Sequence, residues 1–192
     1  STEEQESLLQ ACKESRNKQL HDIVVLLLST AARKNEILGL RWGDVDFDRR
    51  VIIFKKTKNK KLRALPIRDR AETILKERSK IRRLDTDLVF PGPYRHGKET
   101  KPTNIQSAWD WAVERANLQD FRLHDTRHTA ASALAKAGAT LPELAALLGH
   151  RQLSMVQRYA HFCEGYGGEL VERMNTALFE KKEGADDERQ VN

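Results

Sequence analysis

The stretch FRLHDTRHTAASALAKAG, residues 121–138, decides how the rest of the chain is interpreted. Its second half is rich in alanine and ends at Gly138, which is typical of a helix closed by a C-terminal glycine. Positions i, i+3 and i+4 share a helix face, so we expect His124, Arg127 and His128 to point the same way near a helix start. A helix N-terminus with a guanidinium beside it favours anions. This stretch therefore predicts a site for an oxyanion, most simply a phosphate.

The composition limits the classes of protein to consider. The chain has 192 residues, with 34 Lys and Arg against 28 Asp and Glu, a net charge of +6 that suits a polyanionic partner without demanding one. Its longest apolar run, residues 23–28, is far shorter than the ~20 residues of a membrane span. Cys12 and Cys163 lie far apart and lack zinc-ligand spacing. With no signal segment, we expect an intracellular, reduced protein.

Periodicity predicts a mainly helical chain with one small β region. Helical spacing indicates helices at 3–16, 21–29, 68–82, 102–116 and 141–148, one that begins at Arg33, one closed by Gly138, a further helical turn at 154–159 and a last helix at 169–182. Asp125 or Thr126 is the expected N-cap of the central helix. Short β-branched or alternating runs indicate strands at 45–47, 51–54 and 63–67. The acidic residues 183–192 are expected to be disordered.

The turn between the last two strands is strongly basic. From Lys55 to Arg63, six of nine residues are basic and none is acidic. Such a run is usually a solvated hairpin tip. The functional interpretation is a basic finger laid into a nucleic-acid groove or onto a phosphate.

Five segments in this order resemble the catalytic domain of tyrosine recombinases, in particular phage-type integrases. They are TAARKNEILGLRW, TKNKKLRALPI, LHDTRHTAASALAKAG, LLGH and MVQRYAH. The ordered set is far more specific than any one motif, and the similarity covers roughly residues 2–165. The resemblance implies an α+β, mainly α-helical fold with a small antiparallel three-stranded sheet. It makes residues 1–182 the catalytic domain and implies that the N-terminal DNA-binding domains usual in this family are absent from this chain.

Carried over by position, the resemblance implies six catalytic residues: Arg33, Lys58, His124, Arg127, His150 and Tyr159. Supporting roles fall to Glu36, Asp125 and His128, and DNA contacts to Lys55, Lys56, Lys60, Lys61 and Arg63. The lysine assignment depends on the register of the hairpin, because a shift of one or two residues would move the role. The chain also departs from the family at Ala31, where glycine is frequent, and at Thr126, where an apolar residue is frequent.

These residue types suit the breakage of a phosphodiester. Two arginines and His150 can hold the nonbridging oxygens, on which charge grows in the transition state. Tyr159 is a weak nucleophile while protonated, so a base such as His124 must take its proton. Lys58 can protonate the departing 5′-oxygen. The product is a 3′-phosphotyrosine, which a second DNA end can attack without metal or ATP, so no cofactor is expected.

The same resemblance implies the partners. They are double-stranded DNA and three further copies in a homo-tetramer on DNA, with a monomer as the alternative state in its absence. Exchange of the C-terminal segment between protomers is one arrangement that Gly165, Gly167 and Gly168 would permit, and packing of that segment on its own domain is the other. No membrane is involved, and the expected location is the bacterial cytoplasm, with nucleoid association during the reaction.

Three other functions stay open. A metal-dependent hydrolase could use His124, His128 and His150 as ligands, although Arg127 would repel the metal and the expected acid is missing. A DNA-binding module without catalysis would bind DNA less tightly on Arg127→Ala, with no cleavage to lose. A type IB topoisomerase-like enzyme would share the tyrosine chemistry. Taken singly, each residue also has an ordinary structural explanation, such as an ion pair between Arg33 and Glu36.

Overall fold

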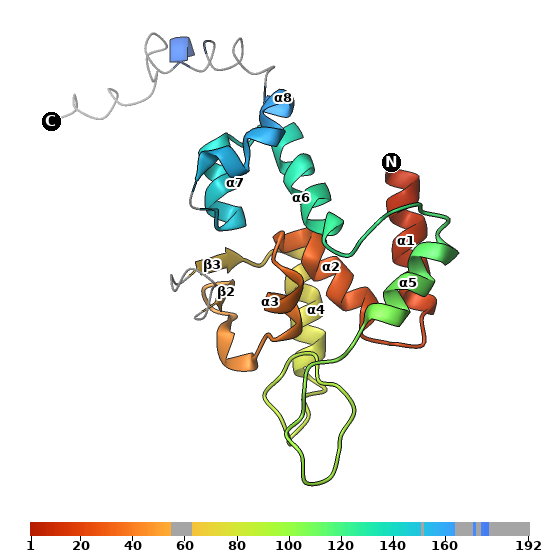
Figure 1. Cartoon of the computed structure of the whole chain (residues 1–192). Helices are drawn as coiled ribbons and strands as arrows, with labels where there is room; N and C mark the ends of the chain where they lie inside the picture. Colours follow the sequence, from red (N-terminus) through yellow and green to blue (C-terminus); the bar gives the residue numbers. More distant parts are fainter. Residues whose placement is uncertain (55–62, 151, 164–170, 172–173, 177–192) are drawn as a thin grey trace, which may run out of the picture.

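The computed structural model describes residues 1–54, 63–150, 152–163, 171 and 174–176. The fold is α+β and mainly helical, with one small sheet, as the sequence predicts (Figure 1). The helices are α1 Thr2–Glu14, α2 Leu20–Thr30, α3 Lys34–Leu38, α4 Asp69–Ser79, α5 Gln106–Arg115, α6 Asp125–Lys136, α7 Leu141–Leu148 and α8 Ala160–Cys163. The strands are β1 Val45–Asp46, β2 Val51–Phe54 and β3 Arg63–Pro66, and the 3₁₀ turns are η1 Trp42–Asp44, η2 Leu153–Met155 and η3 Gln157–Tyr159.

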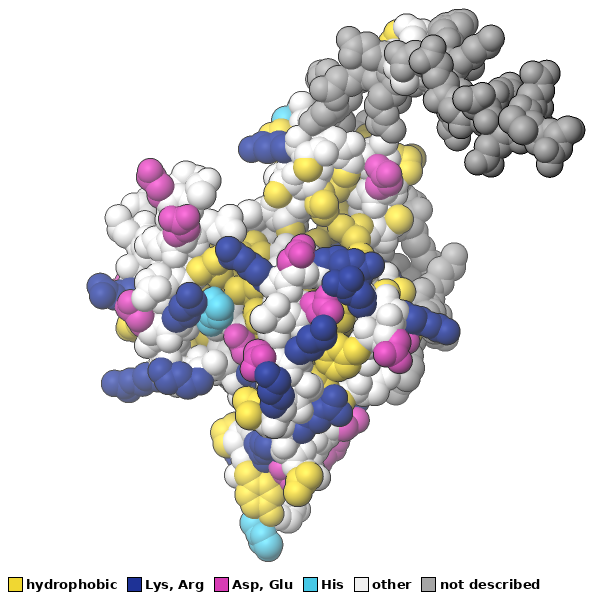
Figure 2. Space-filling view, turned by 180° about the vertical axis from the view of Figure 1, so that it is seen from behind, with side chains coloured by type: hydrophobic (Ala, Val, Ile, Leu, Met, Phe, Trp, Pro, Cys, Tyr) yellow, Lys and Arg dark blue, Asp and Glu magenta, His cyan; other side chains and the backbone are white. Residues whose placement is uncertain are grey.

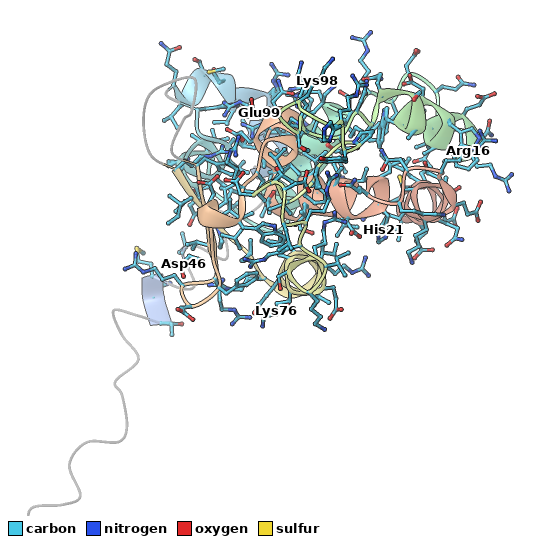
Figure 3. All side chains as sticks on the ribbon, turned by 90° about the horizontal axis from the view of Figure 1, so that it is seen from below. Arg16, His21, Asp46, Lys76, Lys98 and Glu99 are labelled. Carbon is cyan, nitrogen blue, oxygen red and sulfur yellow. The ribbon has the colours of Figure 1, made fainter. Side chains whose placement is uncertain are left out.

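Helix α2 is the centre of the larger core. It packs against α1, α4 and α6, and α5 covers α1 on the outside. Figure 3 views α1 and α4 end-on with α2 between them. Helix α2 is apolar nearly all round, which is why it is buried on several sides at once. Trp109 of α5 and Phe90 complete this core and are almost fully buried.

The sheet is antiparallel, in the order β1-β2-β3. Ile52 and Leu65 pair across β2 and β3, and both side chains are buried. Their neighbours along each strand are more exposed, which is the alternation expected of a sheet with one solvated face. Buried side chains of the sheet and of α3 belong to the larger core.

A smaller core lies between α6, α7 and η3. It is built largely from alanines of α6, with Leu144, Leu148 and Val156, and it includes the ring of Tyr159. In Figure 1 these helices form the upper part of the molecule, and α6 descends from them to the C-terminal end of α2. Small alanine side chains let α6 approach its neighbours closely. The N-terminal end of α6 is thereby placed between the two cores.

Several predicted boundaries were wrong for physical reasons. Helix α5 begins at Gln106 instead of Pro102, because the amide of Thr103 donates to the carbonyl of Phe90 and Pro102 forms a β-bridge with Pro91. These contacts hold the chain extended. The first helix starts one residue earlier than expected, because Ser1 forms a capping box with Glu4. Most of the helix predicted at 169–182, and the tail 183–192, lie outside the described residues.

The surface carries both signs of charge. Viewed from behind, Lys and Arg side chains alternate with Asp and Glu over one face, instead of forming a single basic field (Figure 2). Figure 3 labels Lys76 of α4 and Asp46 of the sheet among the outward-pointing charges. Among the described residues, no helix is long and apolar enough to cross a membrane.

Candidate active site

Arg33 marks the start of α3. The chain leaves α2 through Ala31, whose φ of 50° places it in the left-handed region. Arg33 then occupies the N-cap position, where its amide and its Nη1 donate to the two carboxylate oxygens of Glu36 at 2.8 and 3.2 Å. The ion pair considered from the sequence is therefore present. The Arg33 side chain stays 36% exposed and lines a groove, so the pair orients the guanidinium without burying it.

The entry to α6 differs from the prediction. His124, which is exposed, occupies the N-cap position without capping through its side chain. The carboxylate of Asp125 instead accepts from the amide of Arg122 at 2.7 Å, and the hydroxyl of Thr126 donates to the carbonyl of Leu123. Neither predicted residue is the N-cap, because both side chains are used by the turn that precedes the helix. Asp125 therefore supports the entry of α6, which places His124 in the groove.

Arg127 is buried between the two cores. Its side chain is 4% exposed, and its guanidinium donates to the carbonyls of Ala31 and Leu148. Its Nη2 also lies 3.3 Å from Nε2 of His150. Burial, followed by the charge of nearby Arg33, lowers the pKa of Arg127 from 12.5 to about 10. The group is still charged at neutral pH, and its contacts fix its direction.

His150 follows the C-terminal end of α7. Gly149 adopts φ 63°, the left-handed conformation that ends many helices, and this turn directs His150 toward Arg127. Burial lowers the pKa of His150 from 6.5 to about 4, and the charge of Arg127 adds to the effect. The ring is therefore neutral at physiological pH. Its Nδ1 is buried and has no hydrogen-bond partner among the described residues.

Tyr159 lies in η3 and is 5% exposed. Its hydroxyl lies 2.7 Å from Nδ1 of His128. Burial raises the pKa of Tyr159, and burial together with the neighbouring His124 lowers the pKa of His128. A neutral imidazole has one nitrogen free to accept a proton. The pair thus has the spacing of a nucleophile and its base.

The two histidines of α6 lie differently with respect to Tyr159. His124 was considered as the base for Tyr159, but the structure brings His128 to the hydroxyl, while the ring of His124 stands edge-on to that of His128 at 5.2 Å. The expectation that Arg127 and both histidines share one direction holds for the two histidines, whose rings meet, but not for Arg127. Neighbouring residues on a helix point about 100° apart. Arg127 therefore turns to His150 while His128 turns to Tyr159.

A groove of about 1120 Å³ runs past the entry of α6 and contains Arg33 and His124. Sequence reasoning did not identify Lys34, Arg41 and Gln106, which also line this groove. The position of Lys34 beside Arg33 was the available signal. Arg41 lies in the quoted segment TAARKNEILGLRW but was given no role, and Gln106 is brought there by the fold.

The remaining predicted residues divide into two groups. Lys58, with Lys55, Lys56, Lys60 and Lys61, lies outside the described residues, so these assignments stay predictions. Arg63 is described, and it is buried and paired with Glu36. Across the described part of the chain, no group of three or more His, Cys, Asp or Glu side chains could hold a metal ion.

The sequence is similar to those of known proteins over most of its length. The phage integrase family profile matches residues 1–164. The chain is 32% identical over 163 residues to a shufflon-specific DNA recombinase of Escherichia coli and 30% identical over 177 residues to the integrase of Salmonella phage P22. These matches cover 83% and 85% of the chain but only 39% and 43% of the relatives, so the chain spans about two fifths of their length.

Solved structures agree with the sequence comparison. The catalytic domain of bacteriophage HP1 integrase matches with a TM-score of 0.67 and 31% identity, over 90% of this chain and 92% of that one. The XerA recombinase matches with a TM-score of 0.69 over 94% of this chain and 63% of that one. At 21% identity, the XerA match shows the shared fold alone.

Proposed function

The chain belongs to the phage integrase family, and we propose that it is the catalytic domain of a site-specific DNA recombinase. It cleaves and rejoins DNA by transesterification through a 3′-phosphotyrosine formed by Tyr159. The observation that carries the proposal is the contact of the Tyr159 hydroxyl with His128, on the same helix turn as the buried Arg127. A nucleophile, a base and a fixed positive charge are thus supplied together.

The site residues that the structure describes divide the reaction between them. Arg33 and Arg127 hold the nonbridging oxygens of the phosphodiester. Nε2 of His150 accepts from Arg127 in this structure, so a third hydrogen bond from His150 to these oxygens requires the tautomer that carries the proton on Nε2. Tyr159 passes its proton to His128 as its oxygen attacks phosphorus, and the 5′-oxygen leaves. His124 stays in the groove as a further contact to the DNA. We assign protonation of the leaving oxygen to Lys58, because a lysine ammonium can supply that proton.

The partners follow from the relatives. The solved neighbours include the Tn1549 transposon integrase in complex with circular intermediate DNA and the XerH recombinase bound to its difH substrate. We propose that this chain likewise acts on double-stranded DNA, as a tetramer during strand exchange.

Covalent capture tests the reaction without knowledge of the target site. A pool of nicked duplexes with randomised sequence is incubated with the chain, and protein–DNA adducts are isolated after denaturation and sequenced. The wild-type chain should form adducts that share a sequence, and it should do so in excess chelator. Tyr159→Phe should abolish the adducts and leave DNA binding within about twofold, because only the nucleophilic oxygen is removed.

Tyr94→Phe is the matched control, because Tyr94 is exposed and belongs to the loop before α5. It should form adducts at the wild-type rate. Adducts that persist in Tyr159→Phe would contradict the assignment of the nucleophile. Relaxation of supercoiled DNA without any sequence preference would favour a topoisomerase-like activity.

A further inference from the structure

Arg63 begins β3, directly after a basic run in the sequence, and the sequence places it among the DNA contacts. Its position in the fold is different. The side chain is 9% exposed and lies against the ring of Phe54, with 5.4 Å between the guanidinium carbon and the ring centroid. A guanidinium buried to this extent offers little surface to DNA, which favours another role for Arg63.

One edge of the Arg63 guanidinium meets the carboxylate that orients Arg33. Nη2 of Arg63 lies 2.5 Å from Oε2 of Glu36, and the two oxygens of the same carboxylate accept from the amide and from Nη1 of Arg33. The Glu36 side chain is only 12% exposed, so water does little to replace these contacts. Glu36 is thus shared by two arginines, one in the groove and one behind it.

The other edge meets the end of α7. Nη1 of Arg63 donates to the carbonyl of Leu147 at 3.3 Å. A Cβ added to Gly149 would lie 2.8 Å from the same Nη1, so the glycine leaves the space that Arg63 fills. His150 is the next residue, and its ring contacts Arg127. In Figure 1, β3 lies directly below α7, consistent with this contact.

The proposed phosphate site has Arg33 on one side and His150 on the other. Arg63 contacts the supports of both, Glu36 and the carbonyl of Leu147, without being part of the site. The arrangement is costly. Nε of Arg63 is buried without a partner among the described residues, and burial lowers the pKa of Arg63 despite the charge of Glu36. A well-packed apolar side chain would often fill such a space with equal or better stability. This loss of stability is explained if the guanidinium is needed for its two directed contacts, to Glu36 and to the carbonyl of Leu147.

We propose that Arg63 is a positioning residue that fixes the spacing between Arg33 and His150. It holds Glu36 on one side and the Leu147–Gly149 turn on the other, so the two oxyanion donors keep one distance before DNA arrives. The inference rests on the proposed cleavage reaction. Arg63 then acts from behind the site, in place of the DNA contact expected from the sequence.

The test compares Arg63→Met with Arg63→Lys and with the control Arg49→Met. Methionine keeps an unbranched apolar stem, and lysine keeps the charge but cannot donate along two fixed directions. Arg49 is an exposed arginine of the same sheet region, with 79% of its side chain accessible. Two quantities are measured on the duplex selected by covalent capture. One is the single-turnover rate of adduct formation at saturating protein concentration, and the other is the affinity for DNA at several salt concentrations.

Arg63→Met should slow adduct formation by about 100-fold, the scale of losing one oriented oxyanion donor, with affinity changed by less than about threefold. The salt dependence of binding should stay unchanged, whereas a lost phosphate contact would lower its slope by about 0.9. Arg63→Lys should fall between wild type and Arg63→Met. Methylguanidinium should restore part of the rate to Arg63→Ala, because it can occupy both edges of the vacated site. Arg49→Met should cleave at the wild-type rate.

A wild-type cleavage rate in Arg63→Met would overturn the inference, and so would weaker binding with a smaller salt slope. If Arg63→Met fails to fold, Arg63→Lys and the methylguanidinium rescue decide the question. A second readout needs no cleavage. The nuclear magnetic resonance titration of His150 should move toward its ordinary range in Arg63→Met, as the turn loosens and one neighbouring charge is removed. Absence of adducts from the wild-type chain would instead contradict the proposed reaction, and the titration would still test Arg63.

Discussion

Acid should destabilise this protein through His150. The pKa of His150 is lowered from 6.5 to about 4 by burial and by Arg127, with a smaller effect of Arg33. Because the unfolded chain binds this proton at a higher pH than the folded chain, the stability contribution is complete above pH 6.5 and is lost as the pH falls toward 4. A difference of one between the folded and unfolded pKa is worth about 1.4 kcal/mol. Allowing for screening by solvent at a partly exposed ring, the free energy of unfolding should fall by about 2–3 kcal/mol.

Urea denaturation between pH 4 and 8 measures this loss. His150→Gln is the comparison, because it keeps a hydrogen-bonding side chain that does not titrate. The difference between wild type and variant isolates His150 from His128, whose pKa is also lowered and which changes stability in the same direction. A difference that stays constant from pH 8 to 4, or a His150 ring that titrates near 6.5 by nuclear magnetic resonance, would refute the electrostatic account of the site.

Three further predictions follow from the contacts. Arg127→Lys should slow adduct formation by about 100-fold or more, because a compact ammonium lacks the planar fork that reaches two separated carbonyls and a phosphate in fixed directions, while circular dichroism stays unchanged. Trp109→Ala should lower the free energy of unfolding by about 3–5 kcal/mol, whereas Trp111→Ala, at a 42% exposed position, should lower it by less than about 1 kcal/mol in the same urea titration. Thr140→Ala removes the capping box of α7 and should lower the melting temperature by an amount equivalent to about 1 kcal/mol.

Local patterns predicted the elements well where burial follows from periodicity. The apolar run of α2, the β-branched run of β2 and the glycine after α7 each carry a signal that depends on a few neighbouring residues. The same patterns placed the start of α5 four residues early, at Pro102. That boundary depends on a bridge to Pro91, which lies in a different part of the chain.

The candidate site shows the same division. The ordered motifs pointed to Arg33, Arg127, His150 and Tyr159, and the structure brings Arg127 to His150. They could not show which imidazole meets the tyrosine, because that depends on where η3 packs against α6. Nor could they separate Arg63 from the neighbouring lysines. Its burial is decided by Glu36 and by the end of α7, which are distant in sequence.

The placement of Tyr159 has a consequence for how the reaction begins. Its ring belongs to the smaller core, and its hydroxyl is bound to His128, so the nucleophile is held back from solvent. It is carried by η3, a single 3₁₀ turn followed by the four-residue helix α8, and such short elements have few backbone hydrogen bonds to break. Arg127 is instead fixed by two carbonyls from separate elements. Arg127 is therefore held firmly, whereas Tyr159 is carried by a short element. In the proposed reaction, binding of DNA and delivery of the nucleophile would then be separate steps, with His128 retaining Tyr159 until the phosphate is in place.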